Sequence, residues 1–107
     1  IAGHYYHITH HLAEQLQWVT DEHELAIVLD ALDRFSRKYH IQVIAWNIMS
    51  NHVHLIIRTM EASRVSKFMQ AFLSSSVQRI NRRRLRDALQ ADPHLLVEPP
   101  KVRFEGR

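Results

Sequence analysis

Two histidines separated by a single apolar residue are the part of this sequence with the clearest chemical use. The two lie in the segment Asn51-His52-Val53-His54. An apolar run begins directly after it at Leu55, as expected of a strand. Because successive side chains of a strand point to opposite faces, His52 and His54 would project together from one face. Imidazole is the commonest protein ligand for divalent transition metals, and two imidazoles leave coordination positions open for phosphate oxygens. The pattern predicts a two-point metal site, although a half-buried strand in a chain with nine histidines can carry such a triplet by chance.

Two further residues are candidates for the same site. His7 would share the face of the pair if Tyr6 and Ile8 point toward the core, which makes it a candidate third ligand, with a hydrogen-bonded structural histidine as the alternative. Asn51 is expected first to form the turn before the strand, and otherwise to orient His52 or a bound base. Five other histidines show no spacing that requires a metal, namely His10, His11, His23, His40 and His94.

Hydrophobic periodicity predicts the elements that would position these residues. Apolar alternation and β-branched residues predict strands at 5–9, 41–48 and 52–58, with a turn between the last two. Helical spacing predicts one helix that opens at Thr20-Asp21 and a second one that is capped by Ser63. The core stripe of the second helix is expected to comprise Val65, Phe68, Met69, Phe72, Ser76 and Ile80.

The order strand, helix, two strands, helix predicts an α+β fold. It matches a ferredoxin-like antiparallel sheet with two helices packed on one face, in which the first strand lies beside the third. Val53, Leu55 and Ile57 would then be buried against the helices, while His52 and His54 look out of the opposite, open face.

Composition limits the class of protein. A chain of 107 residues forms one domain. The absence of cysteine suits a reducing cytoplasm, no apolar run approaches the ~18 residues that span a bilayer, and no signal peptide is visible. The first residue is Ile, so a trimmed N-terminus is expected. Trp18 and Trp46 are expected to pack in the core or under loops, although an exposed Trp18 could stack on a base.

The charge of the chain is unevenly distributed. A formal net charge of +3 and a sequence pI near 9.7 favour anionic partners. Residues 21–33 carry five acids and no Lys or Arg, whereas residues 64–86 carry seven basic residues. The basic segment either contacts phosphates or is a solvated helix end that complements the helix dipole. The candidate DNA-binding residues are Arg79, Arg82, Arg83, Arg84 and Arg86.

The segment 49–56 (MSNHVHLI), with an apolar strand before it, resembles the His-hydrophobe-His (HUH) signature of single-tyrosine transposases. That family includes the insertion-sequence transposases and the REP-associated tyrosine transposases. Segments 6–9 (YHIT), 66–70 (SKFMQ) and 81–83 (NRR), the last closing the second helix, match in the family's order. The ordered set covers roughly residues 3–84 and is far more specific than the histidine triplet alone.

The resemblance implies a DNA transposase that acts on hairpin-flanked single-stranded DNA, as a monomer or a homodimer. In the family the two motif histidines, here His52 and His54, hold Mg²⁺ or Mn²⁺ against the scissile phosphate. A tyrosine on a later helix attacks the phosphorus, which gives a 5′-phosphotyrosine link and a free 3′-hydroxyl.

The tyrosines depart from this pattern. Tyr5, Tyr6 and Tyr39 all precede His52, whereas the family's nucleophile follows the histidine pair, so the catalytic tyrosine is unknown. The segment 102–107 resembles the basic aromatic segment that usually precedes the tyrosine helix. We therefore expect residues 1–107 to form a single HUH-like domain without its catalytic helix.

Two other classes remain open. A catalytically inactive DNA-binding module of the same family would keep the sheet and the basic helix but need no metal, so metal titration separates it from a transposase. A histidine-triad nucleotide hydrolase needs a third alternating histidine, and the residue at that position is Ile56. This residue counts heavily against a hydrolase of that type.

Overall fold

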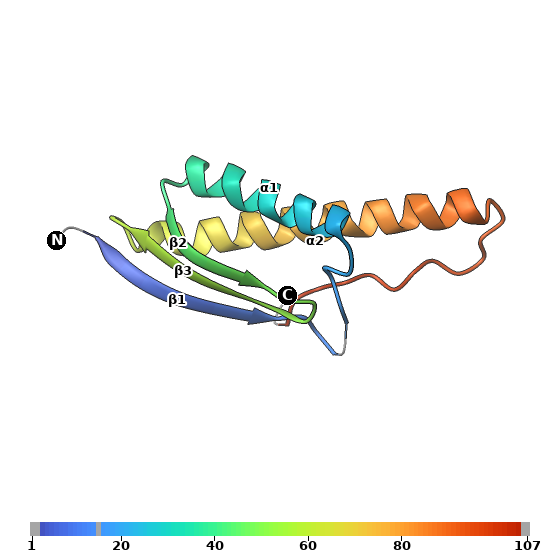
Figure 1. Ribbon diagram of the computed structural model, residues 1–107, viewed down its shortest axis with the longest axis horizontal. Helices are drawn as coiled ribbons and strands as arrows, with labels where there is room; N and C mark the ends of the chain where they lie inside the picture. Colours follow the sequence, from blue (N-terminus) through green and yellow to red (C-terminus); the bar gives the residue numbers. More distant parts are fainter. Residues whose placement is uncertain (1–2, 15, 106–107) are drawn as a thin grey trace.

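The protein is described by a computed structural model over residues 3–14 and 16–105. Along this part of the chain the elements are β1 (His4–His11), α1 (Glu22–Lys38), β2 (Gln42–Ile48), β3 (His52–Thr59) and α2 (Ser63–Ala91). The strands form one antiparallel sheet in the order β1-β3-β2, and both helices lie on the same face of it (Figure 1). The predicted α+β class is confirmed, with the first strand beside the third.

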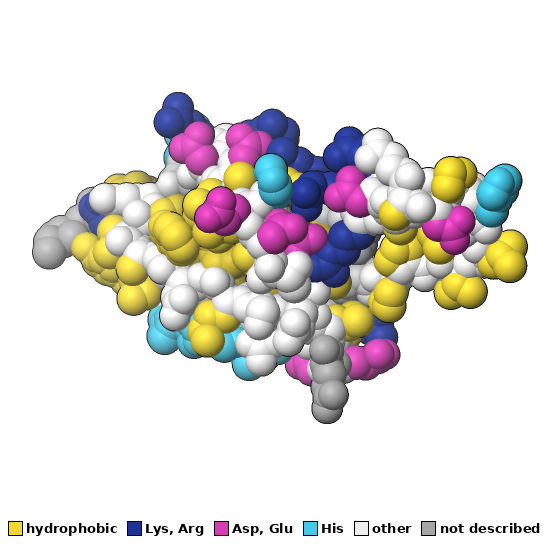
Figure 2. Space-filling view, turned by 45° about the vertical axis from the view of Figure 1, so that its right-hand side comes forward, with side chains coloured by type: hydrophobic (Ala, Val, Ile, Leu, Met, Phe, Trp, Pro, Cys, Tyr) yellow, Lys and Arg dark blue, Asp and Glu magenta, His cyan; other side chains and the backbone are white. Residues whose placement is uncertain are grey.

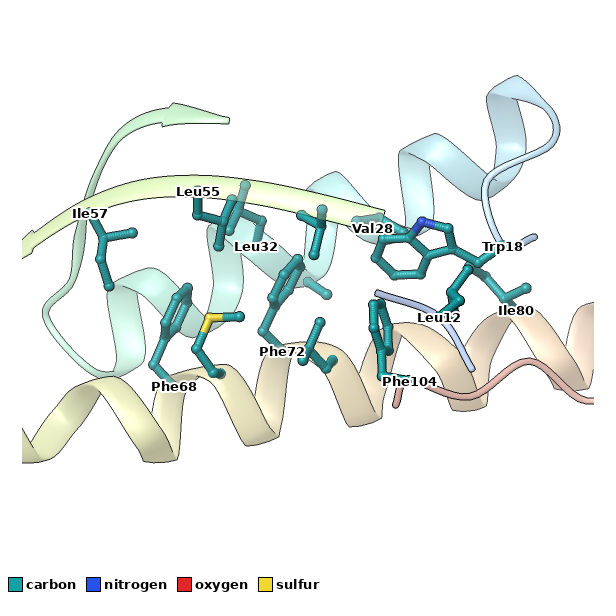
Figure 3. Packing of buried hydrophobic residues seen from close by; sticks show 14 of the residues in the cluster. Leu12, Trp18, Val28, Leu32, Leu55, Ile57, Phe68, Phe72, Ile80 and Phe104 are labelled. Atoms are coloured by element: carbon teal, nitrogen blue, oxygen red, sulfur yellow. The ribbon is translucent and has the colours of Figure 1, made fainter. Parts of the chain in front are cut away.

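The central strand β3 alternates as its sequence predicts. Val53, Leu55 and Ile57 are fully buried, whereas the side chains between them are partly or wholly exposed. Figure 3 shows Leu55 and Ile57 pointing toward Phe68 and Phe72 of α2. Burial of each such side chain contributes about 1.5–3 kcal/mol. A slip of one residue would exchange these side chains with the histidines, so the core determines which face the histidines take.

The first helix begins where the sequence predicts. Asp21 is the N-cap residue, and its side chain accepts a hydrogen bond of 2.8 Å from the backbone N–H of Glu24. Basic residues in the last turn of α1, Arg37 and Lys38, complement the helix dipole.

The second helix differs from prediction at both ends. Ala62, not Ser63, is at the N-cap, because the turn at Glu61 supplies carbonyl acceptors and no side-chain cap is formed. The segment 81–83 does not close the helix, which continues to Ala91. Good helix-forming residues follow it, and the first residue unable to continue a helix is Pro93. The distal part of α2 therefore extends beyond the sheet (Figure 1).

After α2 the chain returns along the helix toward the sheet (Figure 1). Asn81 holds it there, because its side chain donates to the carbonyl of Val102 over 3.1 Å and accepts from the N–H of Val102 over 2.9 Å. Phe104, which is buried, forms a β-bridge with Leu12. The end of β1 thus has a neighbour on the edge where the fourth strand of a ferredoxin-like sheet would lie.

The two tryptophans have different environments. Trp18 is fully buried, donates a hydrogen bond of 2.7 Å from Nε1 to the carbonyl of Met49 and packs edge-on against Phe104. Its predicted packing role is confirmed, and burial rules out stacking on a base. Trp46 is 48% exposed, so the prediction that it packs is wrong. It lies on the edge strand β2, next to a register shift between Val43 and Ala45.

Among the described residues, no helix combines the length and the apolar character needed to cross a membrane.

Candidate metal centre

The two motif histidines lie on the open face of the sheet with two histidines of β1. Register pairs Thr9 with His54 and His11 with His52. The ring centroids of His52 and His54 are 4.9 Å apart, those of His11 and His52 5.1 Å, and those of His7 and His54 5.5 Å. Strand pairing therefore gathers four imidazoles on one surface, of which His52 and His54 share a strand.

Asn51 is placed to orient the first of the pair. Its Oδ1 lies 2.7 Å from Nδ1 of His52. An amide oxygen can only accept, so Nδ1 of His52 carries the proton and Nε2 keeps its lone pair. Nε2 is thereby the nitrogen available to a metal ion, and the neighbouring hydrogen bond holds the ring in that orientation.

The second imidazole is contacted at the corresponding nitrogen. Nδ1 of His54 lies 3.0 Å from Oγ1 of Thr9 and 3.3 Å from Nε2 of His7. In the tautomer in which Nδ1 of His54 donates to Oγ1 of Thr9, Nε2 keeps its lone pair for a metal ion. His7 approaches His54 on the Nδ1 side, which is the position of an orienting neighbour.

The electrostatic environment favours the ligand form of His52. Partial burial, followed by repulsion from His54 and His11, lowers the pKa of the His52 imidazole below its ordinary value. A lowered pKa keeps this imidazole neutral near pH 7, and metals bind the neutral form.

The donors fit a site with two protein nitrogens. Within residues 3–14 and 16–105, no set of three or more His, Cys, Asp or Glu side chains is arranged to hold a metal ion. The role of His7 as a third ligand stays a prediction, and His52 and His54 are the two candidate ligands that share a strand. A divalent ion bound by these two would take its other ligands from water or from oxygens of a bound phosphate.

His11 is the residue of this surface that sequence reasoning assigned no role. Its ring stacks on that of His52 at an interplanar angle of 24°. The available signal was its position four residues after His7, on the same face of β1, but only the register places it opposite His52.

The predicted DNA-binding arginines lie on the helical side of the molecule. Figure 2 shows basic side chains beside acidic ones over this layer and histidines along the lower edge of the view. Arg79 pairs with Asp30 over 2.8 Å, and Arg83 pairs with Asp21 over 3.4 Å. The basic segment of α2 is thus partly neutralised by the acidic segment of α1.

Arg84 has the most buried of these ion pairs. Its Nε lies 2.6 Å from Oε2 of Glu24, a residue that is only 2% exposed, and its Nη2 donates to the carbonyl of Trp18 over 2.7 Å. Thr20 also donates to Glu24, from both its backbone and its hydroxyl. Arg84 is therefore a structural residue that joins α2, α1 and the segment before α1, which leaves exposed Arg82 and Arg86 as the arginines best placed to meet a ligand.

Comparison with known protein families gives a match over most of the chain. Residues 1–96 match the family described as transposase IS200 like. No curated protein matches the sequence.

Two solved structures resemble the fold. The first is a transposase candidate from Deinococcus radiodurans R1, with a TM-score of 0.63, 18% identity and coverage of 100% of this chain and 81% of that chain. The second is a REP-associated tyrosine transposase bound to a REP hairpin, with a TM-score of 0.52 and 17% identity. That comparison covers 98% of this chain and 56% of the other, so this chain spans little more than half of that protein.

Proposed function

Since the chain belongs to the IS200-like transposase family, we propose that it binds hairpin-flanked single-stranded DNA at a divalent metal ion held by His52 and His54. The observation that carries the proposal is the orientation of the pair. Asn51 and Thr9 contact the two Nδ1 atoms, which leaves both Nε2 atoms for the ion on an open face.

The metal centre would serve a phosphodiester. When bound, Mg²⁺ or Mn²⁺ polarises the scissile phosphate and offsets its developing charge. His52 and His54 hold the ion, and Asn51 and Thr9 keep the two rings from turning. The hairpin as substrate is supported by the REP-associated tyrosine transposase of similar fold, which is bound to one.

The covalent step of this reaction class needs a tyrosine. Its Oη would form a bond to phosphorus while the bond from phosphorus to O3′ breaks, with the proton of the phenol ending on the 3′-oxygen. Tyr39 ends α1 in the helical layer, and Tyr6 packs against the core. Tyr5 faces the open side, but it is four strand residues from Thr9, the partner of His54, or about 13 Å along β1. None of the three is in line with a phosphate at the histidine pair.

A binding and cleavage experiment tests the proposal. The 107-residue chain should bind a labelled hairpin with a single-stranded flank more tightly when Mn²⁺ is present, because phosphate oxygens complete the metal shell. A denaturing gel of the same mixture should show no covalent adduct, since no tyrosine of this chain is in place.

Two outcomes would contradict it. Mn²⁺-independent binding that is unchanged by a double His52→Ala, His54→Ala substitution would remove the metal from the proposal. A covalent band that disappears in Tyr5→Phe, Tyr6→Phe or Tyr39→Phe would show that one of these residues is the nucleophile after all.

The position of the tyrosines also favours a second candidate function, a DNA-binding module without chemistry. Such a module would bind the hairpin equally well with Mn²⁺ or with a chelator. The metal titration therefore separates the two functions without any cleavage assay.

The exposed arginines of α2 carry a separate prediction. If Arg82 and Arg86 contact phosphates, replacing both with Gln should lower the salt slope of log K for single-stranded DNA by about 0.7 for each lost contact. Affinity should fall equally for all DNA sequences, because phosphate contacts carry no base information. The matched control is a double Gln variant of Arg34 and Arg37, whose side chains are 61% and 80% exposed on α1. Equal slopes in both variants and the wild type would assign Arg82 and Arg86 to solubility.

A further inference from the structure

The open face of the sheet continues beyond the histidines toward the start of β1. There Tyr5 is 60% exposed and Ile56 is 39% exposed, so an aromatic and an aliphatic side chain both face solvent. Register pairs Tyr5 with Arg58, and Arg58 with Gln42 on the other side. An aromatic ring, an apolar side chain and a guanidinium therefore meet at this end of the face.

We infer that Tyr5, Ile56 and Arg58 form a nucleotide subsite, in which the ring of Tyr5 stacks on an unpaired base of the DNA strand held at His52 and His54. This inference rests on the proposed function and adds the side chains that would bind the strand next to the scissile phosphate. Stacking on an aromatic ring suits any base, because every base has a π-face.

The spacing assigns the base to a different nucleotide from the one at the metal ion. Tyr5 lies about 13 Å along β1 from the row of Thr9 and His54. A stacked strand rises only roughly 3.4 Å along its axis per nucleotide, so the distance corresponds to several nucleotides. A base on Tyr5 therefore cannot belong to the nucleotide whose phosphate meets the histidines, and the intervening row of His7 and Ile56 spans the gap.

The distribution of charge determines toward which end of the open face a bound DNA strand runs. At the other end of the face, Glu14 and Glu105 line a hollow with His11 and Asn51. Carboxylates there repel a polyanion, although Glu14 is partly neutralised by an ion pair with Arg103. Arg58 places a positive charge at the opposite end. A DNA strand that leaves the histidine pair is thus directed toward Tyr5.

The open-face positions of the sheet themselves carry no acid among the described residues. On β1 and β3 these positions are occupied by histidines and by Tyr5, Thr9, Ile56 and Arg58.

Arg58 is held in place by its surroundings. Its Nη1 donates to Oε1 of Gln42 over 3.1 Å. Gly3, with a φ of +103°, passes so close that a Cβ on it would lie 3.1 Å from Nε of Arg58. A side chain fixed in this way presents its charge without the entropy cost of ordering a free arginine on binding.

Two hairpin probes of equal length and charge test the subsite: one has a short oligothymidylate flank and the other has its abasic counterpart. With Mn²⁺ present, Tyr5→Ala should weaken binding of the base-containing strand roughly 10-fold and leave binding of the abasic strand unchanged. Tyr5→Phe retains the ring and should bind both strands like the wild type. Arg58→Gln should weaken both strands alike and lower the salt slope by about 0.7, whereas Arg37→Gln on α1 should not.

The outcomes separate this inference from the function on which it rests. Oligothymidylate binding that depends on His52 and His54 but is unchanged by Tyr5→Ala overturns the subsite alone. Equal losses for the base-containing and abasic strands in Tyr5→Ala also overturn it, because stacking needs a base. No binding of either strand by the wild type overturns the proposed function together with the subsite.

Discussion

Replacing His52 and His54 together with alanine is expected to abolish manganese binding. The two Nε2 atoms are the only protein donors that we assign to the ion, so removal of both leaves no ligand from the chain. Each single substitution should weaken binding, since one imidazole remains. Wild-type affinity should be modest without DNA and rise when a single-stranded oligonucleotide is added, because phosphate oxygens occupy the open positions. Calorimetric titration of the wild type and the three variants with Mn²⁺, with and without oligonucleotide, measures these affinities.

The matched control removes two histidines elsewhere. His23 and His94 are exposed on α1 and after α2, and a double alanine variant at these positions should bind Mn²⁺ like the wild type. Asn51→Ala should fall between the two variants, about 10-fold weaker than the wild type, because loss of an orienting partner typically costs a factor of this size. Unchanged affinity in the His52, His54 double variant would end the assignment.

The predictable part of this protein is the part that depends on consecutive residues. Alternation along β3 correctly predicts that Val53, Leu55 and Ile57 are buried and that His52 and His54 share the other face. The start of α1 at Asp21 was also predictable, because a cap depends on residues three positions apart.

Features that depend on distant partners could not be predicted in this way. His11 joins the histidines only because β1 pairs with β3 in one register, and no local pattern specifies that register. Trp46 looked like a core residue by type, but its exposure follows from the edge position of β2. Arg84 resembled its basic neighbours in sequence, and its acidic partner Glu24 lies 60 residues earlier.

Arg84 differs from the neighbouring arginines because its acidic partner is buried, and its replacement has the largest expected effect on stability. Arg84→Met should lower the free energy of unfolding by about 3 kcal/mol, because it leaves the carboxylate of Glu24 buried without its cation. Arg83→Met is the matched control. Its partner Asp21 has a side chain that is 48% exposed, and such pairs contribute at most about 1 kcal/mol. Urea unfolding of the wild type and the two variants measures these losses.

The pH dependence identifies the carboxyl group that is responsible. Burial alone would raise the pKa of the Glu24 carboxyl, but hydrogen bonds from Arg84 and Thr20 outweigh it and hold the pKa below the ordinary value of 4.5. The stability gained from a lowered pKa is present above the ordinary value and is lost as pH falls below 4.5 through the lowered pKa.

In Arg84→Met the main counterweight to burial is removed, so the pKa of Glu24 should rise. Protonation then relieves the buried charge as pH falls. The difference in unfolding free energy between wild type and Arg84→Met should therefore be large at about pH 7 and smaller at about pH 4.

The comparison must use that difference, because other carboxyl groups titrate in the same range. The backbone hydrogen bond from Glu24 lowers the pKa of Asp21, and the hydrogen bond from Arg79 lowers that of Asp30. Both groups are common to the two proteins, so their contributions cancel. An equal loss at both pH values, or an equal loss in Arg83→Met, would mean that packing of the arginine stem and not the charge of Glu24 is responsible. Adding Glu24→Gln to Arg84→Met should recover part of the loss, since the buried group then carries no charge at any pH.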